Sequence, residues 1–286
     1  PTIVAGCMGA RAVALSPEGK VLWTFEAPYY KRVGHMRVVF PADLEGKGKQ
    51  VAVLGSDNWH FYAVDAQGKQ IWAYESVHGS TCGAAADVDG DGRQEVVAGT
   101  EYYWWHVVRP EGKGLFSYST RSGPHANAAT TANLDGDKTR CVVFGGADGN
   151  VHVLGPDGKL RWQFNAGDEI VSVSAADVNG DGKDEIIAGS MNFNVFAIDA
   201  TGKAVWRTDV GSEVTGSRVA NTEKGPQVVV TSRDGGLYVL EGATGAVLAG
   251  QRTVPGKALL SVPEIGQTKQ FAIAPANGDL LLFQLP

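Results

Sequence analysis

The sequence predicts an all-β protein, a seven-bladed β-propeller with calcium-binding loops between strands. Three observations predict it: a repeat with a period in the low-to-mid forties, short strand-like segments between turn residues, and no helical periodicity between them. Short, evenly spaced strands of this kind are typical of sheets arranged radially as blades. Because no linker-like or low-complexity segment interrupts the repeat, we expect one domain over residues 1–286.

The first marker of the repeat is a Gly-Lys turn followed by a strand with an aromatic residue. The turn glycines are Gly19, Gly68, Gly112, Gly158 and Gly202, and the pattern fades at Gly245. The aromatic residues are Trp23, Trp72, Phe116, Trp162 and Trp206. Because the tryptophans recur with the repeat, we expect them to pack in the core between blades.

The second marker is a small residue that ends a buried strand, namely Gly6, Gly55, Gly99, Gly145, Gly189, Thr231 and Ala274. If the strands of each copy are called A to D, the first copy contains only B, C and D, and the last contains only A, B and C. Seven blades therefore fit, with terminal blades that are incomplete or share strands. The sequence leaves open how the ring closes.

An acidic loop joins strands A and B in two of the copies. Oxygen side chains occupy its positions 1, 3, 5 and 9, with glycines at 4 and 6 and a backbone carbonyl available at 7, which is a ligand pattern suited to Ca²⁺. In the first loop these positions are Asp87, Asp89, Asp91, Arg93 (backbone) and Glu95. In the second they are Asp177, Asn179, Asp181, Lys183 (backbone) and Glu185. We expect structural calcium here; the alternative is a polar turn without metal.

The same loop is degraded in two other copies. One keeps Asn133, Asp135 and Asp137 but has Cys141 at position 9. The other keeps Asp43 and Glu45 and has Lys47 at position 5, where an ammonium group could replace the charge of the ion. We expect no metal in either.

The composition excludes some classes of function. The 286 residues are 43% hydrophobic and carry a net charge of -6, which argues against nucleic acid as a partner. No apolar run is long enough to span a bilayer. The three cysteines lack metal-type spacing and are expected to be small core residues. Because Pro1 begins inside a strand-like segment, the sequence leaves open that further domains belong to the same chain.

The hairpins between strands B and C can be compared between copies. Copies four, six and seven carry Asp148-Gly149, Asp234-Gly235 and Asn277-Gly278, the common signal for a two-residue hairpin. In copies two, three and five the glycine is replaced by Trp59, Tyr103 or Phe193, followed by His60, Trp104 or Asn194. Losing a glycine suited to positive φ costs stability, so we expect another role for these side chains.

In a propeller blade these hairpins share one face with the loops that join strand D to the next strand A. In the first three copies those loops contain Tyr29, Tyr30, Lys31, Arg32, His35, Arg37, His78, Arg121, His125 and Asn127. His35 and His125 occupy equivalent positions near the start of strand A. We therefore predict a concave, aromatic-lined binding site over blades one to three and five. Its predicted ligand-contacting residues are Tyr30, Lys31, Arg37, Trp59, Trp104, His125, Phe193 and Asn194.

Neighbouring residues have a structural interpretation. His106 and His152 align with Tyr62 and Tyr238 of other copies, and Trp105 falls at a position that is apolar in every copy. For His35, His60 and His125 individually, an inert surface role stays open.

Two resemblances follow from these motifs. The acidic loops resemble the FG-GAP calcium repeats of integrin-type propellers, and the Gly-Lys-x-x-Trp strands resemble the PQQ-type propeller repeat. Together they cover nearly the whole chain and imply a fold rather than a function. The order His35, His60, Tyr103, Arg121 is similar to that in propeller-type polysaccharide lyases such as the ulvan lyases and, more loosely, the rhamnogalacturonan lyases, although those enzymes are longer.

The lyase resemblance implies roles for four residues. Arg121 would neutralise a uronate carboxylate, Tyr103 with His60 would transfer protons during β-elimination, and His35 would position the substrate. Lys31, Arg32, Arg37 and Arg121 would favour an acidic polysaccharide or oligosaccharide. One alternative is a non-catalytic carbohydrate-binding module of a larger protein; either interpretation implies a secreted or periplasmic location. A third class, a protein-interaction propeller, explains the exposed Tyr and Trp residues but the histidines less naturally.

Overall fold

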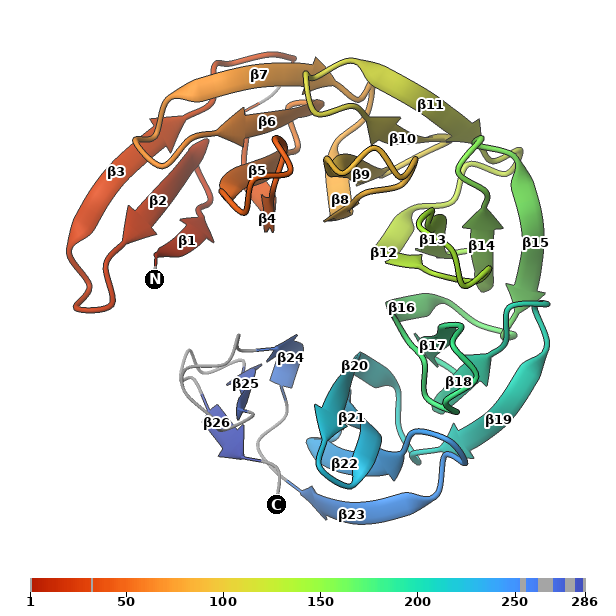
Figure 1. The fold of residues 1–286 in the computed structure, drawn as a ribbon. Coiled ribbons are helices and arrows are strands. Elements are labelled where there is room, and N and C mark those ends of the chain that lie inside the picture. Colours follow the sequence, from red (N-terminus) through yellow and green to blue (C-terminus); the bar gives the residue numbers. More distant parts are fainter. Residues whose placement is uncertain (1, 32, 253–255, 262–269, 276–280, 285–286) are drawn as a thin grey trace. The chain divides into compact units, whose positions relative to one another are not determined.

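The computed structural model describes residues 2–31, 33–252, 256–261, 270–275 and 281–284, with side chains described up to residue 252. Within these ranges all regular elements are β-strands and none is a helix, as predicted. The strands form seven consecutive antiparallel sheets, five with four strands and two with three (Figure 1). Neighbouring strands in each sheet are also neighbours in sequence, which is the up-and-down order of a propeller blade.

The strand boundaries follow the predicted repeat. The first sheet contains β1 (Ile3–Gly6), β2 (Arg11–Leu15) and β3 (Val21–Glu26). The second contains β4 (Met36–Ala42), β5 (Val51–Ser56), β6 (His60–Val64) and β7 (Gln70–Glu75). The third contains β8 (Ser80–Ala86), β9 (Glu95–Thr100), β10 (Trp104–Val108) and β11 (Gly114–Ser119). The fourth contains β12 (Ala126–Ala132), β13 (Cys141–Gly146), β14 (Asn150–Leu154) and β15 (Leu160–Asn165).

The remaining three sheets continue the same order. The fifth contains β16 (Ile170–Ala176), β17 (Glu185–Ser190), β18 (Asn194–Ile198) and β19 (Ala204–Asp209). The sixth contains β20 (Val214–Thr222), β21 (Gly225–Ser232), β22 (Gly236–Glu241) and β23 (Val247–Arg252). The last contains β24 (Gly256–Ser261), β25 (Gln270–Pro275) and β26 (Leu281–Gln284). The first and last sheets thus have the three strands expected of them, whereas the predicted Asn277-Gly278 hairpin lies outside the described residues.

The chain comprises two compact units. The first consists of Pro1–Thr131, Lys138–Phe144 and Leu154–Arg161, and the second of Ala132–Asp137, Gly145–Val153 and Trp162–Pro286. Most of the predicted ligand-contacting residues lie in the first unit, whereas Phe193 and Asn194 lie in the second.

The recurring tryptophans join consecutive repeats, as predicted. In the first unit the indole of Trp72 covers the turn glycine Gly112 so closely that a Cβ there would lie 2.6 Å from Trp72 Cγ. Trp72 Nε1 also donates a hydrogen bond of 2.9 Å to the Pro110 carbonyl. In the second unit Trp162 and Trp206 make the same contacts with the following turn, donating to the carbonyls of Ala200 and Gly242. Each tryptophan therefore packs between two sheets, and Trp72 and Trp206 are buried whereas Trp162 is half-buried.

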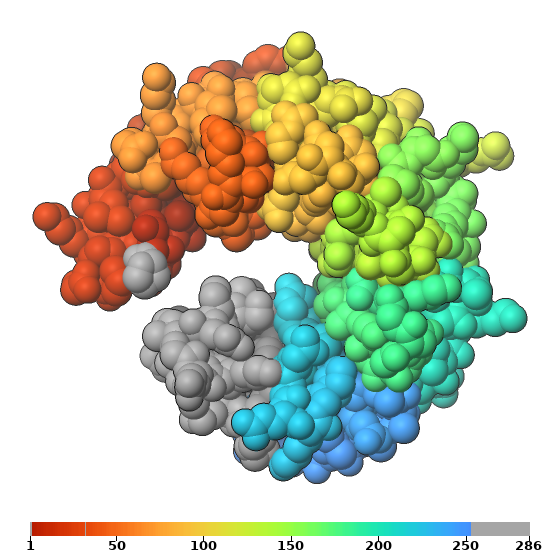
Figure 2. Space-filling model, viewed as in Figure 1, coloured from red at the N-terminus to blue at the C-terminus, as the bar shows by residue number. Residues whose placement is uncertain are grey.

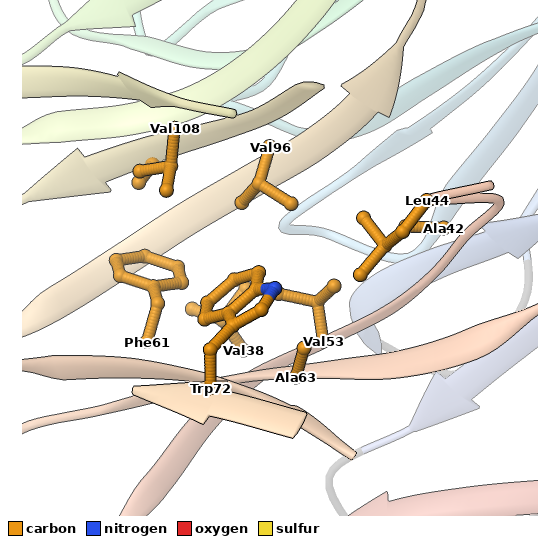
Figure 3. Close-up of a cluster of buried hydrophobic side chains, with 10 residues drawn as sticks. Val38, Ala42, Leu44, Val53, Phe61, Ala63, Trp72, Val96 and Val108 are labelled. Atoms are coloured by element: carbon orange, nitrogen blue, oxygen red, sulfur yellow. The ribbon is translucent and has the colours of Figure 1, made fainter. Parts of the chain in front are cut away.

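The core around Trp72 shows how two sheets of the first unit share apolar residues. Val53, Phe61 and Ala63 from its own sheet surround the indole, and Val96 and Val108 of the third sheet pack into the same cluster (Figure 3). The atoms of these two sheets form one continuous surface (Figure 2). This packing sets the two hairpin tips of these sheets, β5–β6 and β9–β10, next to each other.

Candidate functional site

A chain of aromatic and histidine rings joins the hairpins and loops of the second and third sheets. Tyr30 contacts His60 edge-on, with ring centroids 4.9 Å apart. Trp59 contacts His78 at 5.7 Å, His78 contacts Tyr102 at 5.4 Å, and Tyr102 contacts His125 at 5.4 Å. We call this set the aromatic rim; it consists of Tyr30, Trp59, His60, His78, Tyr102, Tyr103 and His125. Tyr102 and Tyr103 are 46% and 47% exposed, so both side chains are partly open to solvent.

Backbone strain accompanies the rim at Trp59. Its φ of 73° lies in the left-handed region, which is unusual for a bulky residue. Lys31, at φ 58°, places its ammonium 4.4 Å from the centre of the Trp59 ring. Tyr103 occupies the equivalent hairpin position without a positive φ, and its ring instead lies against Gly123, where a Cβ would come within 2.7 Å of Tyr103 Cε1. Trp59 and Tyr103 therefore occupy equivalent hairpin positions and both belong to the rim, but Trp59 has a positive φ and Tyr103 does not.

The four residues predicted to be catalytic are not brought into contact with one another. His60 stacks on Tyr62 and has Nδ1 3.2 Å from the Asn58 carbonyl. His35 Nδ1 accepts a hydrogen bond of 2.8 Å from the Gly9 amide, which ties this ring to the first sheet. Arg121 is exposed and forms no hydrogen bond or ion pair with any described residue. Among the described residues, no hydrogen bond, ion pair or ring contact joins any two of His35, His60, Tyr103 and Arg121.

Three acidic residues that were not predicted from the sequence, Asp57, Glu75 and Glu101, contact residues of the rim or its basic neighbour Arg37. The guanidinium of Arg37 is 3.4 Å from Asp57 Oδ2 and 3.6 Å from Glu101 Oε1. Glu75 Oε1 accepts a hydrogen bond of 2.9 Å from the Tyr30 hydroxyl, which raises the pKa of Tyr30. Arg37 is therefore already neutralised by two carboxylates, which weakens its predicted role with an anionic sugar.

A repeat comparison could have found two of these acids. Asp57 and Glu101 both follow directly after strand B of their copies, and the equivalent positions in the next three copies are Ala147, Met191 and Arg233. Acids at this position thus occur in two of the copies that carry an aromatic residue at the hairpin tip.

The other predicted ligand-contacting residues have different environments. Trp104 opens β10 and is exposed. Phe193 is exposed at φ 73° in the second unit. Asn194 is buried, and its Nδ2 donates to the backbone and side-chain oxygens of Asn192, so its amide closes the hairpin. Arg32 lies outside the described residues.

The acidic loop of the third sheet gathers three carboxylates. One oxygen each of Asp87, Asp89 and Glu95 lies within 4.8 Å of the others. Asp87 accepts hydrogen bonds from the amides of Gly90 and Gly92, which folds the loop around it. Burial, followed by the charges of Asp89 and Asp91, raises the pKa of Glu95 to about 7. A cation at this point would relieve that repulsion, so these three residues fit a calcium site.

Asp91, the predicted ligand at position 5, has another partner. Its Oδ2 lies 2.7 Å from Arg93 Nη2, and its Oδ1 accepts from the Arg93 amide. In the second loop Asn179 Nδ2 donates to Glu185 Oε1 at 2.8 Å, while Asp177 accepts from the amides of Gly180 and Gly182. The second loop thus has the same backbone turn with one carboxylate fewer.

Backbone hydrogen bonds also connect the loops of neighbouring repeats. Within the first unit the Gln94 amide donates to the Asp43 carbonyl at 3.1 Å. Within the second unit the Asp184 amide donates to the Asn133 carbonyl at 2.8 Å. In the degraded loop, Lys47 Nζ lies 3.2 Å from Glu45 Oε2, which provides a positive charge there as the sequence suggested.

Comparison with known proteins addresses the fold. A family model described as "Outer membrane protein assembly factor BamB" (PQQ_2) matches residues 147–264, in agreement with the predicted PQQ-like repeat. No curated protein matches the sequence. No described helix is long and apolar enough to cross a membrane.

Solved structures are similar over most of the chain. The crystal structure of BamB from Moraxella catarrhalis is 15% identical with a TM-score of 0.69, covering 99% of this chain and 82% of that one. Sqt1 from Saccharomyces cerevisiae is 12% identical with a TM-score of 0.80, covering 100% and 81%. BBS1N, crystallised in complex with ARL6DN, is 15% identical with a TM-score of 0.71, covering 99% and 91%.

The chain has the β-propeller fold. At these identities the likeness establishes nothing beyond the fold. None of these descriptions names a polysaccharide lyase or a carbohydrate ligand.

Proposed function

We propose that this chain is a non-catalytic, seven-bladed propeller whose aromatic rim docks an exposed segment of a partner protein. The observation that carries the proposal is the continuous line of ring contacts across two neighbouring sheets, with Tyr102 and Tyr103 half exposed. Tyrosine and tryptophan dominate the energetic centres of protein interfaces, because they bury a large area at a small cost in side-chain entropy.

Two further observations support a docking role. BBS1N was crystallised in complex with ARL6DN, and the matching family is described as an assembly factor. General acid–base chemistry requires a proton donor and acceptor within hydrogen-bond reach of one reacting centre. The predicted catalytic residues, by contrast, have separate partners: His35 accepts a hydrogen bond from the Gly9 amide, and His60 stacks on Tyr62 and contacts Tyr30 edge-on.

Carbohydrate binding is the competing function, because exposed Tyr102, Tyr103 and Trp104 would also stack on sugar rings. An acidic sugar would need cationic partners, and Arg37 is shared by Asp57 and Glu101. Among the described basic residues that were predicted to bind an anionic sugar, only Lys31 and Arg121 have no carboxylate partner. The lyase hypothesis therefore has less physical support than protein docking.

The test uses the purified chain as bait against a random-peptide display library and, in parallel, a glycan array that includes uronate polymers. We expect peptides whose binding is lost in Tyr103→Ala and kept in Phe193→Ala, an exposed aromatic of the second unit. Selective binding of glycans with no Tyr103-dependent peptide would favour the carbohydrate module. Release of an unsaturated uronate, followed by its absorbance, would restore the lyase.

We further propose that Asp87, Asp89 and Glu95 hold one structural calcium ion, with Asp177, Asn179 and Glu185 as a second, weaker site. Calorimetric titration of Ca²⁺ into chelator-treated protein should give a tight site, and free calcium at about 100 times Kd should add roughly 2.7 kcal/mol to the free energy of unfolding. A melting temperature unchanged by chelation would reject both sites. The location we propose is secreted or periplasmic, where extracellular-type calcium sites are filled.

A further inference from the structure

We propose that Gln94 couples calcium binding in the acidic loop of the third sheet to the conformation of the degraded loop in the second sheet. This coupling rests on the calcium site proposed at Asp87, Asp89 and Glu95, and it extends the effect of the ion to a second repeat. Asp184 has the equivalent role between the fifth and fourth sheets. In both cases the loop with the fuller ligand set holds the degraded loop of the preceding repeat.

Gln94 exchanges two hydrogen bonds with one residue of the second sheet. Its backbone amide donates to the Asp43 carbonyl at 3.1 Å, and its side-chain Oε1 accepts from the Asp43 amide at 2.8 Å. Paired residues of an antiparallel sheet exchange two bonds in the same way. We call this pair of hydrogen bonds the clasp. Because Gln94 directly precedes Glu95 in the chain, a shift of one residue displaces the other.

The partner residue, Asp43, also folds its own loop. Its carboxylate accepts hydrogen bonds from the amides of Lys47 and Gly48, so its backbone belongs to the clasp and its side chain to the degraded loop. A close backbone contact accompanies the clasp, because a Cβ at Gly46 would collide with the Gly92 carbonyl oxygen. Opening the clasp would therefore release the residue around which the degraded loop is folded.

The same arrangement recurs in the second unit. The Asp184 amide donates to the Asn133 carbonyl at 2.8 Å, and Asp184 Oδ2 accepts from the Asn133 amide at 2.7 Å. The Asn133 side chain accepts from the Gly136 amide and donates to the Asp137 carbonyl, so it too folds its own loop. Asp184 directly precedes Glu185. The clasp is thus repeated at position 8 of both loops that carry a glutamate at position 9.

The contact between the fourth and third sheets differs. Position 8 there is Arg140, whose amide donates to the Val88 carbonyl at 3.2 Å and whose Nε donates to Thr131 Oγ1. An arginine side chain has no acceptor, so it cannot return a hydrogen bond to a backbone amide of the other loop. The next residue is Cys141, at the position where the predicted calcium loops carry glutamate. The clasp therefore accompanies the carboxylate at position 9.

Charge repulsion explains how an ion would act on the clasp. One oxygen each of Asp87, Asp89 and Glu95 lies within 4.8 Å of the others, so these groups repel one another when ionised and no cation is bound. A cation would fix Glu95, and through it Gln94, which favours the closed clasp. Such coupling is reciprocal, because a conformation favoured by the ion also favours binding of the ion. Changes in the second sheet should therefore alter calcium affinity in the third.

The first experiment follows hydrogen exchange in segments 43–50 and 87–95 of chelator-treated protein, with and without added Ca²⁺. We expect calcium to slow exchange in both segments of wild type. In Gln94→Ala, calcium should bind roughly two- to tenfold more weakly by calorimetric titration and should no longer protect segment 43–50. Gln94→Asp should keep this protection, because Asp184 makes the same contact in the second unit. Protection of segment 43–50 in Gln94→Ala equal to that in wild type would overturn the role of Gln94.

A second experiment tests the coupling from the other loop. Gly46 and Gly48 both have left-handed φ values, 67° and 75°, but none of the described atoms lies within 4 Å of a Cβ at Gly48. Both substitutions by alanine keep the backbone amide and carry the same kind of backbone cost. Gly46→Ala should weaken calcium binding, because it displaces the carbonyl of Gly92, whereas Gly48→Ala should leave Kd unchanged. A Kd unchanged in Gly46→Ala would overturn the coupling.

The exchange data separate failure of the coupling from failure of the calcium site. Calcium that protects segment 87–95 of wild type but not segment 43–50 would overturn the coupling and leave the proposed calcium site standing. If calcium gives neither heat of binding nor protection of segment 87–95, the site itself is refuted and the coupling with it.

Discussion

The contact between a tryptophan and the next turn glycine makes a quantitative prediction about what holds consecutive blades together. Gly112 and Gly19 occupy the same position in their repeats and have the same φ of 81°. A Cβ on Gly112 would meet Trp72 at 2.6 Å, whereas none of the described residues lies within 4 Å of a Cβ on Gly19. Gly19→Ala is therefore a matched control for Gly112→Ala.

Both substitutions place alanine in the left-handed region, which costs about 1–2 kcal/mol. Gly112→Ala additionally forces the Trp72 indole aside, and overpacking of this kind costs about 1–3 kcal/mol. We expect the free energy of unfolding to fall by about 2–5 kcal/mol for Gly112→Ala and by about 1–2 kcal/mol for Gly19→Ala.

Urea unfolding followed by tryptophan fluorescence measures both variants against wild type, with equal m-values as the check that only the native state changed. Equal losses of stability in the two variants would show that the tryptophan contact contributes nothing. The conformation of the turn would then be stabilised by its own backbone and not by contact with the Trp72 indole.

Three further predictions follow from single side chains. Burial lowers the pKa of His106 from 6.5 to about 4, so the unfolded chain binds a proton that the folded one does not, and the free energy of unfolding should fall by up to roughly 3 kcal/mol as pH decreases through this window. His106→Tyr introduces the residue that Tyr62 provides at the equivalent position of another repeat, and its free energy of unfolding should fall less over the same pH range. Because Glu95 titrates in both proteins, equal pH profiles would show that His106 is not the cause of the fall. Burial raises the pKa of Cys82 to about 12, and a thiol reagent at pH 8 should label it only after unfolding; labelling of native Cys82 would contradict its burial. Asp87→Asn should abolish the calcium-dependent rise in melting temperature and Asp43→Asn should not; equal effects of the two would refute the proposed ligands.

Sequence periodicity was sufficient for the elements of the fold. Turn glycines and strand alternation are local requirements, because a positive φ and a half-buried strand each depend on neighbouring residues. The three-stranded first and last sheets and the tryptophans between sheets could thus be predicted without coordinates. The prediction for Tyr103 was less complete, because its equivalence to a glycine position did not reveal that its backbone avoids positive φ.

The character of the rim depended on tertiary structure. Arg37, Asp57 and Glu101 come from β4, the β5–β6 hairpin and the β9–β10 hairpin, and their charges offset one another only because two sheets pack side by side. Counted along the chain, the basic residues indicated an anionic ligand; placed in space, Arg37 is paired with two carboxylates. Ion pairing depends on distances between segments remote in sequence, and no local pattern encodes those distances. The sequence alone therefore determined the repeat and its strands, and the packing of neighbouring sheets decided that Arg37 is paired with acidic residues.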